Sequence, residues 1–274
     1  MGDQVDGALS GGVPSVSDLR IVEESDLFRE MMLASDDWLE RNDVLLAPYA
    51  SKWVADPLRQ WSRRWEYPFA IHALGSGSSK VLDAGSGFTF FPYYVASKTG
   101  AEFVCCVDND DLADLFTRAG EDGSPVIFRS GDLRQLPLAD GEVDAAYSVS
   151  VLEHTHEFDR IVGELHRVLA PGGSLVVTFD LSLDGLSDIP IPRAAQLVAR
   201  LSDAFEPVDA PRDLDRLVAR PDLLTTLHAA TVDSTRLPWA HPWLSLVKSA
   251  FQHRRLPLAR MKKLSCYGGV FRRV

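Results

Sequence analysis

An apolar run that ends in an acidic residue and a glycine-rich turn is the strongest chemical signal in the sequence. Residues 81–84 include Asp83 and lead directly into the turn Gly85–Gly87. Glycine is needed where a backbone turns sharply and comes close to a ligand. The bulky residues 88–91 would crowd a pyrophosphate, and Asp83 would repel one. Nucleotide-binding folds share such turns, but these details favour a ligand with an ammonium group over a dinucleotide.

Two further acidic residues follow later apolar runs. Asp108 lies 25 positions after Asp83, at the end of the run 102–107. Its carboxylate can accept hydrogen bonds from both hydroxyls of a ribose, and the alternative role is that of a helix N-cap. Asp132 lies in the segment 130–137, where the alternative to ligand binding is a turn-stabilising aspartate. Both residues are candidates for a ligand site.

An alternation of strand and helix patterns positions these residues. We expect strands at 80–84, 102–107, 126–129, 143–149 and 174–179, with helices between them and one or two closing strands within 264–274. Apolar strands that alternate with helices are typical of a parallel sheet covered on both faces. The sequence therefore predicts an α/β, doubly wound fold.

From about residue 80 to residue 180 the sequence resembles the class I S-adenosylmethionine-dependent methyltransferases of the small-molecule type. Four motifs occur in the family's order: the turn after Asp83, Cys106-Val107-Asp108-Asn109, and the segments 130–137 and 144–154. Thr89 stands where the family has a third glycine, which puts the local shape of that loop in doubt. The resemblance implies a mostly parallel, seven-stranded, Rossmann-like sheet. It also implies S-adenosylmethionine (SAM) as cofactor and S-adenosylhomocysteine as product.

The same resemblance implies roles for individual residues. Asp108 corresponds to the family's ribose ligand, and Asp132 with the backbone of Leu133 corresponds to its adenine ligands. The end of the fourth strand, at Ser148 and Val149, faces SAM in the family. The glycine turn wraps the methionine part of SAM, and the acidic residue before it organises the amino group. The cofactor-binding residues implied in this way are Asp83, Gly85, Ser86, Gly87, Asp108, Asn109, Asp132, Leu133, Ser148 and Val149.

A fifth segment, 61–68, resembles a stretch that leads into the SAM site of some small-molecule methyltransferases. Arg63 is suited to bind the SAM carboxylate through a pair of charge-assisted hydrogen bonds. Tyr67 is suited to hydrogen-bond the same methionine end of SAM. The alternative is an ordinary helix whose arginine reaches solvent along its apolar stem and whose tryptophan packs in the core.

The choice of a catalytic residue follows from the reaction. Methyl transfer from a sulfonium is an in-line displacement, so alignment and desolvation supply much of the rate. An oxygen or protonated nitrogen nucleophile also needs a base. His154 is our first candidate because it follows the fourth strand and histidine titrates near neutral pH, with packing or capping as the alternative. His156 and His241 are weaker candidates. Glu153, His154 and His156 lack a ligand from a second segment, so we expect no metal.

Composition limits the partners and the compartment. The net charge of −11 and the pI of about 5.1 disfavour a nucleic-acid substrate. Cys105 and Cys106 are adjacent in an expected strand and point to opposite faces, so reduced thiols and a cytoplasmic location are expected. No apolar stretch reaches the roughly 18 residues that span a bilayer, so no membrane partner is expected. The N-terminus also lacks the pattern of a signal peptide.

The domain organisation is expected to be simple. We expect residues 1–17 to be disordered, 18–75 to form a helical N-terminal cap, and 76–274 to form the SAM-binding domain, with a substrate-cap insertion at about 181–260. All six tryptophans lie in the cap and the insertion. Aromatic walls suit an apolar or ring-bearing substrate, ordinary packing, or a homodimer interface.

Three functions follow from these observations. The leading hypothesis is a methyltransferase that acts on an oxygen or nitrogen of a small molecule such as a specialised metabolite. The second is a SAM-binding protein of the same fold that has lost methyl transfer and catalyses another reaction or serves as a partner subunit. The third and weakest is a nicotinamide oxidoreductase, which the argument on Asp83 disfavours.

Overall fold

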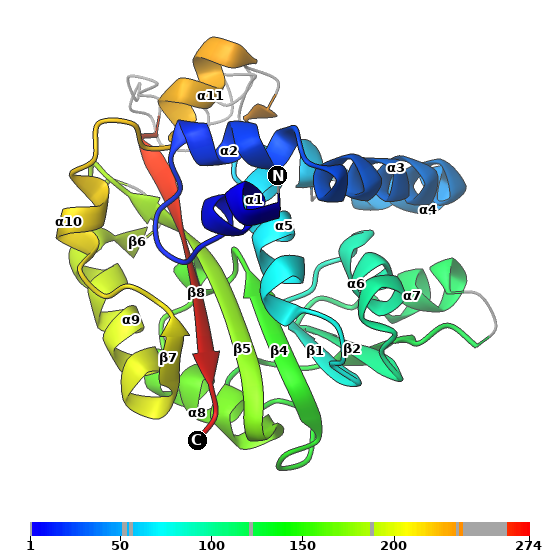
Figure 1. The fold of residues 1–274 in the computed structure, drawn as a ribbon. Coiled ribbons are helices and arrows are strands. Elements are labelled where there is room, and N and C mark those ends of the chain that lie inside the picture. Colours follow the sequence, from blue (N-terminus) through cyan, green and yellow to red (C-terminus); the bar gives the residue numbers. More distant parts are fainter. Residues whose placement is uncertain are drawn as a thin grey trace, which may run out of the picture.

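The computed structural model describes residues 2–50, 54, 57–120, 123–186, 189–233, 236–237 and 262–274. Its centre is one twisted sheet in the order β3-β2-β1-β4-β5-β8-β7, with the short β6 paired to β5 (Figure 1). The strands are β1 Lys80–Ala84, β2 Phe103–Asp108, β3 Val126–Ser130, β4 Val143–Val149, β5 Leu169–Ser182, β6 Ile189–Pro190, β7 Glu206–Asp209 and β8 Leu264–Arg272.

Strand direction confirms a mostly parallel, doubly wound sheet. The pairs β1–β2, β2–β3, β1–β4, β4–β5 and β5–β6 are parallel, and only β8 runs antiparallel, to both β5 and β7. The main path has the seven strands that the sequence resemblance implied, and the two-residue β6 is additional. The edge strand β7 was not predicted, because its four residues, Glu-Pro-Val-Asp, carry no apolar run.

Helices cover both faces of this sheet. They are α1 Gly2–Ala8, α2 Val16–Glu23, α3 Asp26–Arg41, α4 Asp43–Tyr49, η1 Pro57–Arg59, α5 Arg63–Leu74, α6 Phe91–Thr99, α7 Ala113–Ala119, η2 Leu152–His154, α8 Phe158–Val168, α9 Ile191–Ala204, α10 Leu214–Val218 and α11 Thr226–Val232. Among these described helices, none is both long and apolar enough to cross a membrane.

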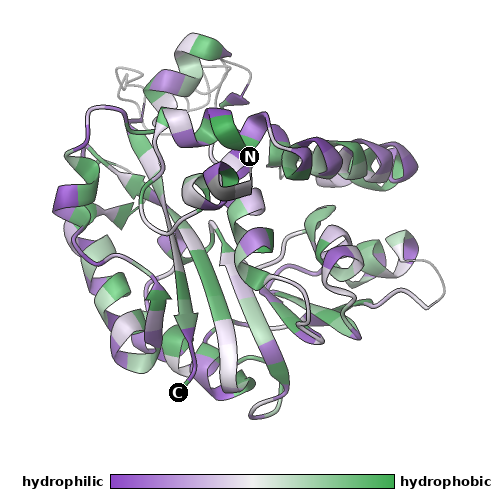
Figure 2. Cartoon of the chain, viewed as in Figure 1, coloured by the Kyte–Doolittle hydropathy of each residue, from purple (hydrophilic) through white to green (hydrophobic). Residues whose placement is uncertain are grey.

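The core divides into two layers, one on each side of the sheet. Val81 and Cys106 pack with α2, α3, α5 and α6 on one face, whereas Leu82 and Cys105 pack with α8 and α9 on the other. This alternation is the period of two expected for a strand, and it explains why the adjacent cysteines stay apart as free thiols. In Figure 2 the middle of the sheet is largely hydrophobic along β5 and β8, while the helices carry both hydrophilic and hydrophobic residues.

The expected disorder of residues 1–17 is wrong for residues 2–17. This N-terminal arm forms α1 and then crosses the sheet edge, where Leu9 and Val13 are buried. Gly12 exchanges two backbone hydrogen bonds with Gly268 of β8, each 2.8 Å long. The glycine-rich composition suggested flexibility, but the few apolar residues of the arm find a long-range partner that composition does not reveal.

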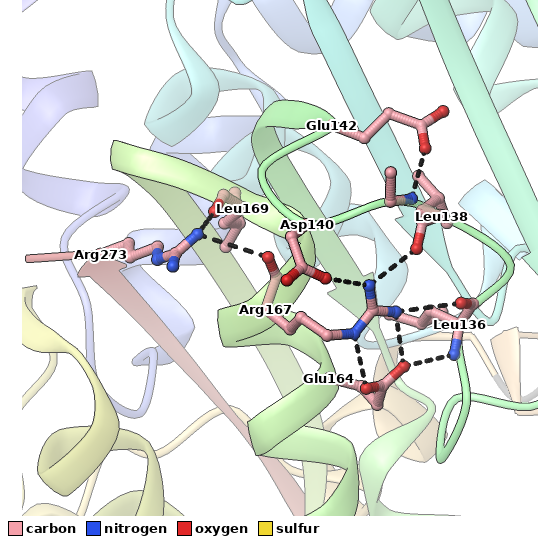
Figure 3. A network of polar contacts seen from close by, with 9 residues as sticks. Leu136, Leu138, Asp140, Glu142, Glu164, Arg167, Leu169 and Arg273 are labelled. Atoms are coloured by element: carbon pink, nitrogen blue, oxygen red, sulfur yellow. Dashed lines mark hydrogen bonds and ion pairs between the residues drawn. The ribbon is translucent and has the colours of Figure 1, made fainter.

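A polar network fixes the chain between β3 and β4 (Figure 3). The guanidinium of Arg167 in α8 donates to the backbone carbonyls of Leu136 and Leu138, at 3.1 and 2.8 Å. It also donates to carboxylate oxygens of Glu164 and Asp140, each at 2.8 Å. Glu164 in turn accepts a hydrogen bond from the Leu136 N–H at 2.7 Å. This connection follows directly on residues 131–134, which line the candidate site.

Candidate functional site

A cavity of about 910 Å³ lies at the carboxyl ends of β1, β2, β3 and β4. Its walls come from the turn after β1, the loops after β2, β3 and β4, and the beginning of α5. The crevice beside β1 and β4 is where the strand order changes direction, which is the usual ligand site of an open α/β sheet. A smaller cavity of about 540 Å³ lies between α8 and α9, and charged residues line most of it.

Most of the predicted cofactor residues meet at the larger cavity. The predicted residues that line it are Arg63, Tyr67, Gly85, Ser86, Gly87, Asp108, Asn109, Asp132, Leu133 and Val149. Asp83 and Ser148 do not line it. The structure therefore gathers residues from five separate segments around one space, and their binding of SAM stays a prediction.

The turn after β1 has the backbone geometry that its glycines allow. Gly85 and Gly87 have φ angles of 83° and 52°, in the left-handed region that other residues avoid. A side chain on Gly85 would also collide with Val151, since a Cβ atom there would lie 2.5 Å from a methyl carbon of Val151. The turn can therefore pass close to a ligand.

Asp108 joins this turn to the end of β2. One of its carboxylate oxygens accepts a hydrogen bond from the Gly87 N–H at 2.9 Å, and the other accepts from the Asp110 N–H at 3.0 Å. Asp108 is not the N-cap of the next helix, because α7 begins at Ala113 and its N-cap residue is Leu112. The carboxylate faces the cavity with lone pairs left for further donors.

Asp132 is held at the cavity rim by Arg134. The two side chains form an ion pair with a nitrogen–oxygen distance of 2.5 Å, and the Arg134 N–H also donates to the carboxylate at 2.8 Å. The hydrogen bonds from Arg134 lower the pKa of Asp132 to about 2, so this carboxylate is ionised at neutral pH. Arg134 also pairs with Glu157, which connects the loop after β3 to the beginning of α8.

Asp83 and Ser148 connect the end of β1, just before the glycine turn, to β4. The Tyr147 hydroxyl donates to Asp83 at 2.9 Å, and the Ser148 hydroxyl donates to the Ala84 carbonyl at 2.9 Å. Burial raises the pKa of Asp83 to about 8, partly offset by the hydrogen bond from Tyr147. Both side chains therefore tie β1 to β4, and direct contact of Asp83 with a ligand amino group stays a prediction.

The beginning of α5 brings a cation to the cavity. The Arg63 guanidinium donates to Glu66 at 2.5 Å and to the hydroxyl of Ser150. Ser150 has a φ angle of 50°, an uncommon conformation for a residue with a side chain, and its hydroxyl contacts Glu66 at 3.0 Å. Burial by itself would lower the pKa of Arg63, but Glu66 and Asp180 raise it above its ordinary value. Arg63 therefore remains charged.

Two tyrosines border the glycine turn. Tyr67 stacks on Phe91 with ring centres 4.1 Å apart, and burial raises its pKa above the ordinary value. Tyr49, at the end of α4, accepts a hydrogen bond from the Phe88 N–H at 3.0 Å through its hydroxyl oxygen. Burial raises the pKa of Tyr49 to about 12, so it stays protonated and keeps one donor for the cavity that it lines.

The segment after β4 brings Glu153 and two of the predicted histidines, His154 and His156, to the cavity. Glu153 is 96% buried, and one of its oxygens accepts a hydrogen bond from the Asp180 N–H at 3.2 Å. His154 is exposed and lines the cavity, so its catalytic role remains a prediction. His156 lies on the rim with its Nδ1 atom 2.8 Å from Arg193. His241 lies outside the described residues. Within those residues, no group of three His, Cys, Asp or Glu side chains is arranged for a metal ion.

Comparison with known proteins identifies the central part of the chain. A family model described as "Methyltransferase domain" matches residues 82–177. The chain carries a methyltransferase domain of the class I, S-adenosylmethionine-dependent family. The match runs from β1 to the middle of β5, so it includes the glycine turn and the loops after β2, β3 and β4.

Two curated relatives extend the similarity beyond this domain. Sterol 24-C-methyltransferase of Aspergillus fumigatus is 27% identical over 213 residues, which are 74% of this chain and 54% of that protein. The probable chloroplastic tocopherol O-methyltransferase of Oryza sativa subsp. japonica is 27% identical over 214 residues, which are 74% of this chain and 58% of that protein. The chain spans about a third to a half of the length of the first curated relatives that it matches.

Solved structures confirm the fold. Geranyl diphosphate C-methyltransferase from Streptomyces coelicolor A3(2) matches with a TM-score of 0.55 and 17% identity, over 77% of each chain. The cyclase SpnF matches with a TM-score of 0.50 and 21% identity, over 81% of this chain and 85% of that one. At this level of identity the similarity concerns the fold alone.

The site also contains residues that the sequence did not suggest, of which Tyr49, Ser150 and Glu153 line the cavity. Tyr49 gave no signal because it lies on a helix far from every motif. Glu66 and Ser150 flank predicted residues, but nothing in the sequence indicated that they share a hydrogen bond across 84 positions. Glu153 was considered only as part of a metal site, although its burial next to the fourth strand was the more informative property.

Proposed function

We propose that the methyltransferase domain binds SAM in the larger cavity and transfers its methyl group to an oxygen or nitrogen of a small molecule, releasing S-adenosylhomocysteine. The observation that carries this proposal is the convergence of the glycine turn, Asp108 and the Asp132–Leu133 loop on one cavity. Its volume of about 910 Å³ lies within the range typical of cofactor and ligand pockets.

The residues present suit each part of SAM. Asp108 offers two carboxylate oxygens to ribose hydroxyls, and the Asp132–Leu133 loop is suited to the adenine. The Nη1 atom of Arg63 donates to Glu66 and Ser150, and the other guanidinium nitrogens of Arg63 can donate to the methionine carboxylate. SAM supplies an activated methyl group on a positively charged sulfur. The chain's contribution is then to align the acceptor, exclude water and receive a proton.

A small acceptor agrees with the shape and charge of the chain. The cavity is bordered by α4, α5 and the loop after β4, and its volume of about 910 Å³ is that of a small-molecule site. The net charge of −11 disfavours nucleic acid. The two curated relatives described above are named for sterol and tocopherol, which are small molecules, and one is named a C- and the other an O-methyltransferase.

The second candidate is a SAM-binding protein without methyl transfer. It remains open because a protein of the same fold is named a cyclase. The two functions make different predictions. A methyltransferase forms S-adenosylhomocysteine when it is given SAM and its acceptor, whereas the second candidate binds SAM tightly without turnover.

The test measures binding and turnover separately. Calorimetry of the full chain with SAM should show saturable binding. Asp108→Ala should weaken this binding by about 1–3 kcal/mol, because two hydrogen bonds to the ribose are lost. Asp111→Ala is the matched control, since Asp111 belongs to the same loop but is exposed and does not line the cavity.

Incubation with SAM and metabolite extracts, followed by mass spectrometry of S-adenosylhomocysteine, then tests transfer. Product that appears only with a particular extract supports the methyltransferase. Equal SAM affinity of the Asp108→Ala variant and the wild type would exclude the proposed cofactor site.

A further inference from the structure

The carboxylate of Glu153 has an unusual environment beside the cavity. The residue is 96% buried, belongs to η2 and lines the cavity. Its Oε1 atom accepts a hydrogen bond from the Asp180 backbone N–H at 3.2 Å. Its Oε2 atom is fully buried and has no hydrogen-bond partner within the part of the chain that the structure describes. A buried acceptor without a hydrogen bond is energetically costly, so a ligand that donates a hydrogen bond to this carboxylate would be favoured.

The charges around Glu153 are mainly negative. The ionisable groups that act on it are the carboxyl groups of Asp180 and Glu66 and the guanidinium of Arg63. Arg63 is already bound to Glu66, whose carboxylate is completely buried. Burial, and then the charge of Asp180, raise the pKa of Glu153 well above its ordinary value. A positive charge placed beside Glu153 would offset this repulsion, and a neutral group would not.

One part of the cavity lining suits a carbon skeleton. Val151, Ile161 and Leu264 line it together with Trp61, and these side chains come from four different segments. A ligand with a positively charged group and an apolar body could therefore place its charge beside Glu153 and its body against these apolar side chains.

We propose that the methyl acceptor is a primary or secondary amine whose ammonium group binds at Glu153, and that the carboxylate of Glu153 removes its proton. This inference rests on the proposed function, which it extends by naming the acceptor class and the base. It assigns to Glu153 the role that the sequence suggested for His154.

The proton and electron changes of this reaction balance. An N–H bond of the ammonium group breaks, and an O–H bond forms on Glu153, which leaves a neutral amine with a lone pair. The nitrogen then attacks the methyl carbon, and the carbon–sulfur bond breaks with its electron pair remaining on sulfur. The products are S-adenosylhomocysteine and a methylated ammonium ion. Glu153 finally releases its proton to water.

The test compares amines with alcohols of the same skeleton. The full chain is saturated with S-adenosylhomocysteine and titrated by calorimetry with benzylamine and benzyl alcohol, and then with phenethylamine and phenethyl alcohol. We expect each amine that binds to bind at least about tenfold more tightly than its alcohol. Glu153→Gln should abolish this preference, because the neutral side chain has the same shape but neither charge nor basicity.

Two further variants control for structural effects. Glu153→Asp keeps the carboxylate and should retain part of the preference for amines. Glu102→Gln changes an exposed glutamate outside the cavity and should behave like the wild type. Circular dichroism and affinity for S-adenosylhomocysteine, measured on the same samples, show whether each variant is folded and keeps its cofactor site.

The outcomes separate this inference from the proposed function. If the wild type fails to bind S-adenosylhomocysteine, the proposed function is wrong. If it binds S-adenosylhomocysteine but no amine in the series, or binds amines and alcohols equally, the amine inference is overturned and the proposed function stands. An undiminished preference for amines in the Glu153→Gln variant would also overturn it.

Discussion

Four acidic side chains near the cavity show how the surroundings of a residue decide its chemistry. Asp132 is partly exposed beside Arg134 and has a lowered pKa, whereas Asp83 is buried with one hydroxyl partner and has a raised pKa. Glu66 is buried against Arg63, and Glu153 is buried with one oxygen unpaired. Residue type is therefore a poor guide to charge here, because solvation and partners differ at each position.

The raised pKa of Asp83 predicts a specific dependence of stability on pH. The folded state holds the proton up to about pH 8, whereas an unfolded aspartate loses it near pH 4. The contribution of Asp83 to the free energy of unfolding is therefore fully present below about pH 4 and is lost as the pH rises to about 8. Thermal unfolding of Asp83→Asn should lack this component, because asparagine does not titrate, while its amide oxygen can still accept the Tyr147 hydrogen bond.

The same variant separates a supporting role from a ligand contact. Because Asp83 does not line the cavity, Asp83→Asn should bind SAM within about threefold of the wild type, which is less than 1 kcal/mol. Asp111→Asn, at an exposed position, should keep the wild-type dependence of stability on pH. A large loss of SAM affinity in Asp83→Asn would restore the direct contact that the sequence resemblance implied.

At the scale of elements, the site depends on contacts between helices and loops that are distant in sequence. The helix α4 reaches the turn after β1 through Tyr49, whose hydroxyl oxygen accepts a hydrogen bond from the Phe88 N–H. The hydroxyl oxygen would lie 3.1 Å from a Cβ atom built on Gly87, so helix and turn are in close contact. The N-terminal helices therefore help to set the shape of the cofactor turn.

Removing this single hydroxyl tests the connection. Tyr49→Phe leaves the Phe88 N–H without its partner, so we expect a loss of about 1–3 kcal/mol in unfolding free energy and a weaker affinity for SAM. Tyr93→Phe is the matched control, because the buried Tyr93 hydroxyl has no hydrogen-bond partner within the described residues. That variant should be neutral or slightly stabilised. Denaturant unfolding and calorimetry with SAM measure both effects, and equal behaviour of the two variants would contradict this role of α4.

At the scale of the whole molecule, the N-terminal arm packs against the end of the chain. Its residue Gly12 pairs with Gly268 of β8, so the segment between α1 and α2 lies against the last strand, while the two ends of the chain themselves lie apart (Figure 1). The Trp65 indole in α5 donates a hydrogen bond to the Ala8 carbonyl at 2.9 Å, which connects the arm to the helix that carries Arg63. The arm therefore contributes to the core and indirectly to the site.

A substitution in the arm distinguishes an ordered segment from a disordered one. Leu9 is 2% exposed, so Leu9→Ala should lower the free energy of unfolding by about 2–5 kcal/mol through lost burial and a cavity. Gln4→Ala, at an exposed position of the same arm, should change it by less than about 0.5 kcal/mol. Chemical denaturation monitored by tryptophan fluorescence measures both values. A Leu9→Ala variant as stable as the wild type would mean that the arm does not pack.

The sequence by itself determined the central sheet and the location of the cavity. The strands β1 to β4 agree with their predicted ranges to within a residue or two, because apolar runs bounded by turn residues are local signals. The carboxyl ends of parallel strands meet at one edge, so Gly85, Asp108 and Asp132 had to come together once the sheet formed.

Only the tertiary structure decided which side chains face that cavity and with what charge. The Tyr147 partner of Asp83 is 64 positions away, and the Ser150 partner of Glu66 is 84 positions away. Such pairs leave no periodic pattern, because they depend on how helices and strands pack after they form. The ordered N-terminal arm and the unpaired oxygen of Glu153 have the same origin, since burial is a property of the folded chain and not of a local sequence.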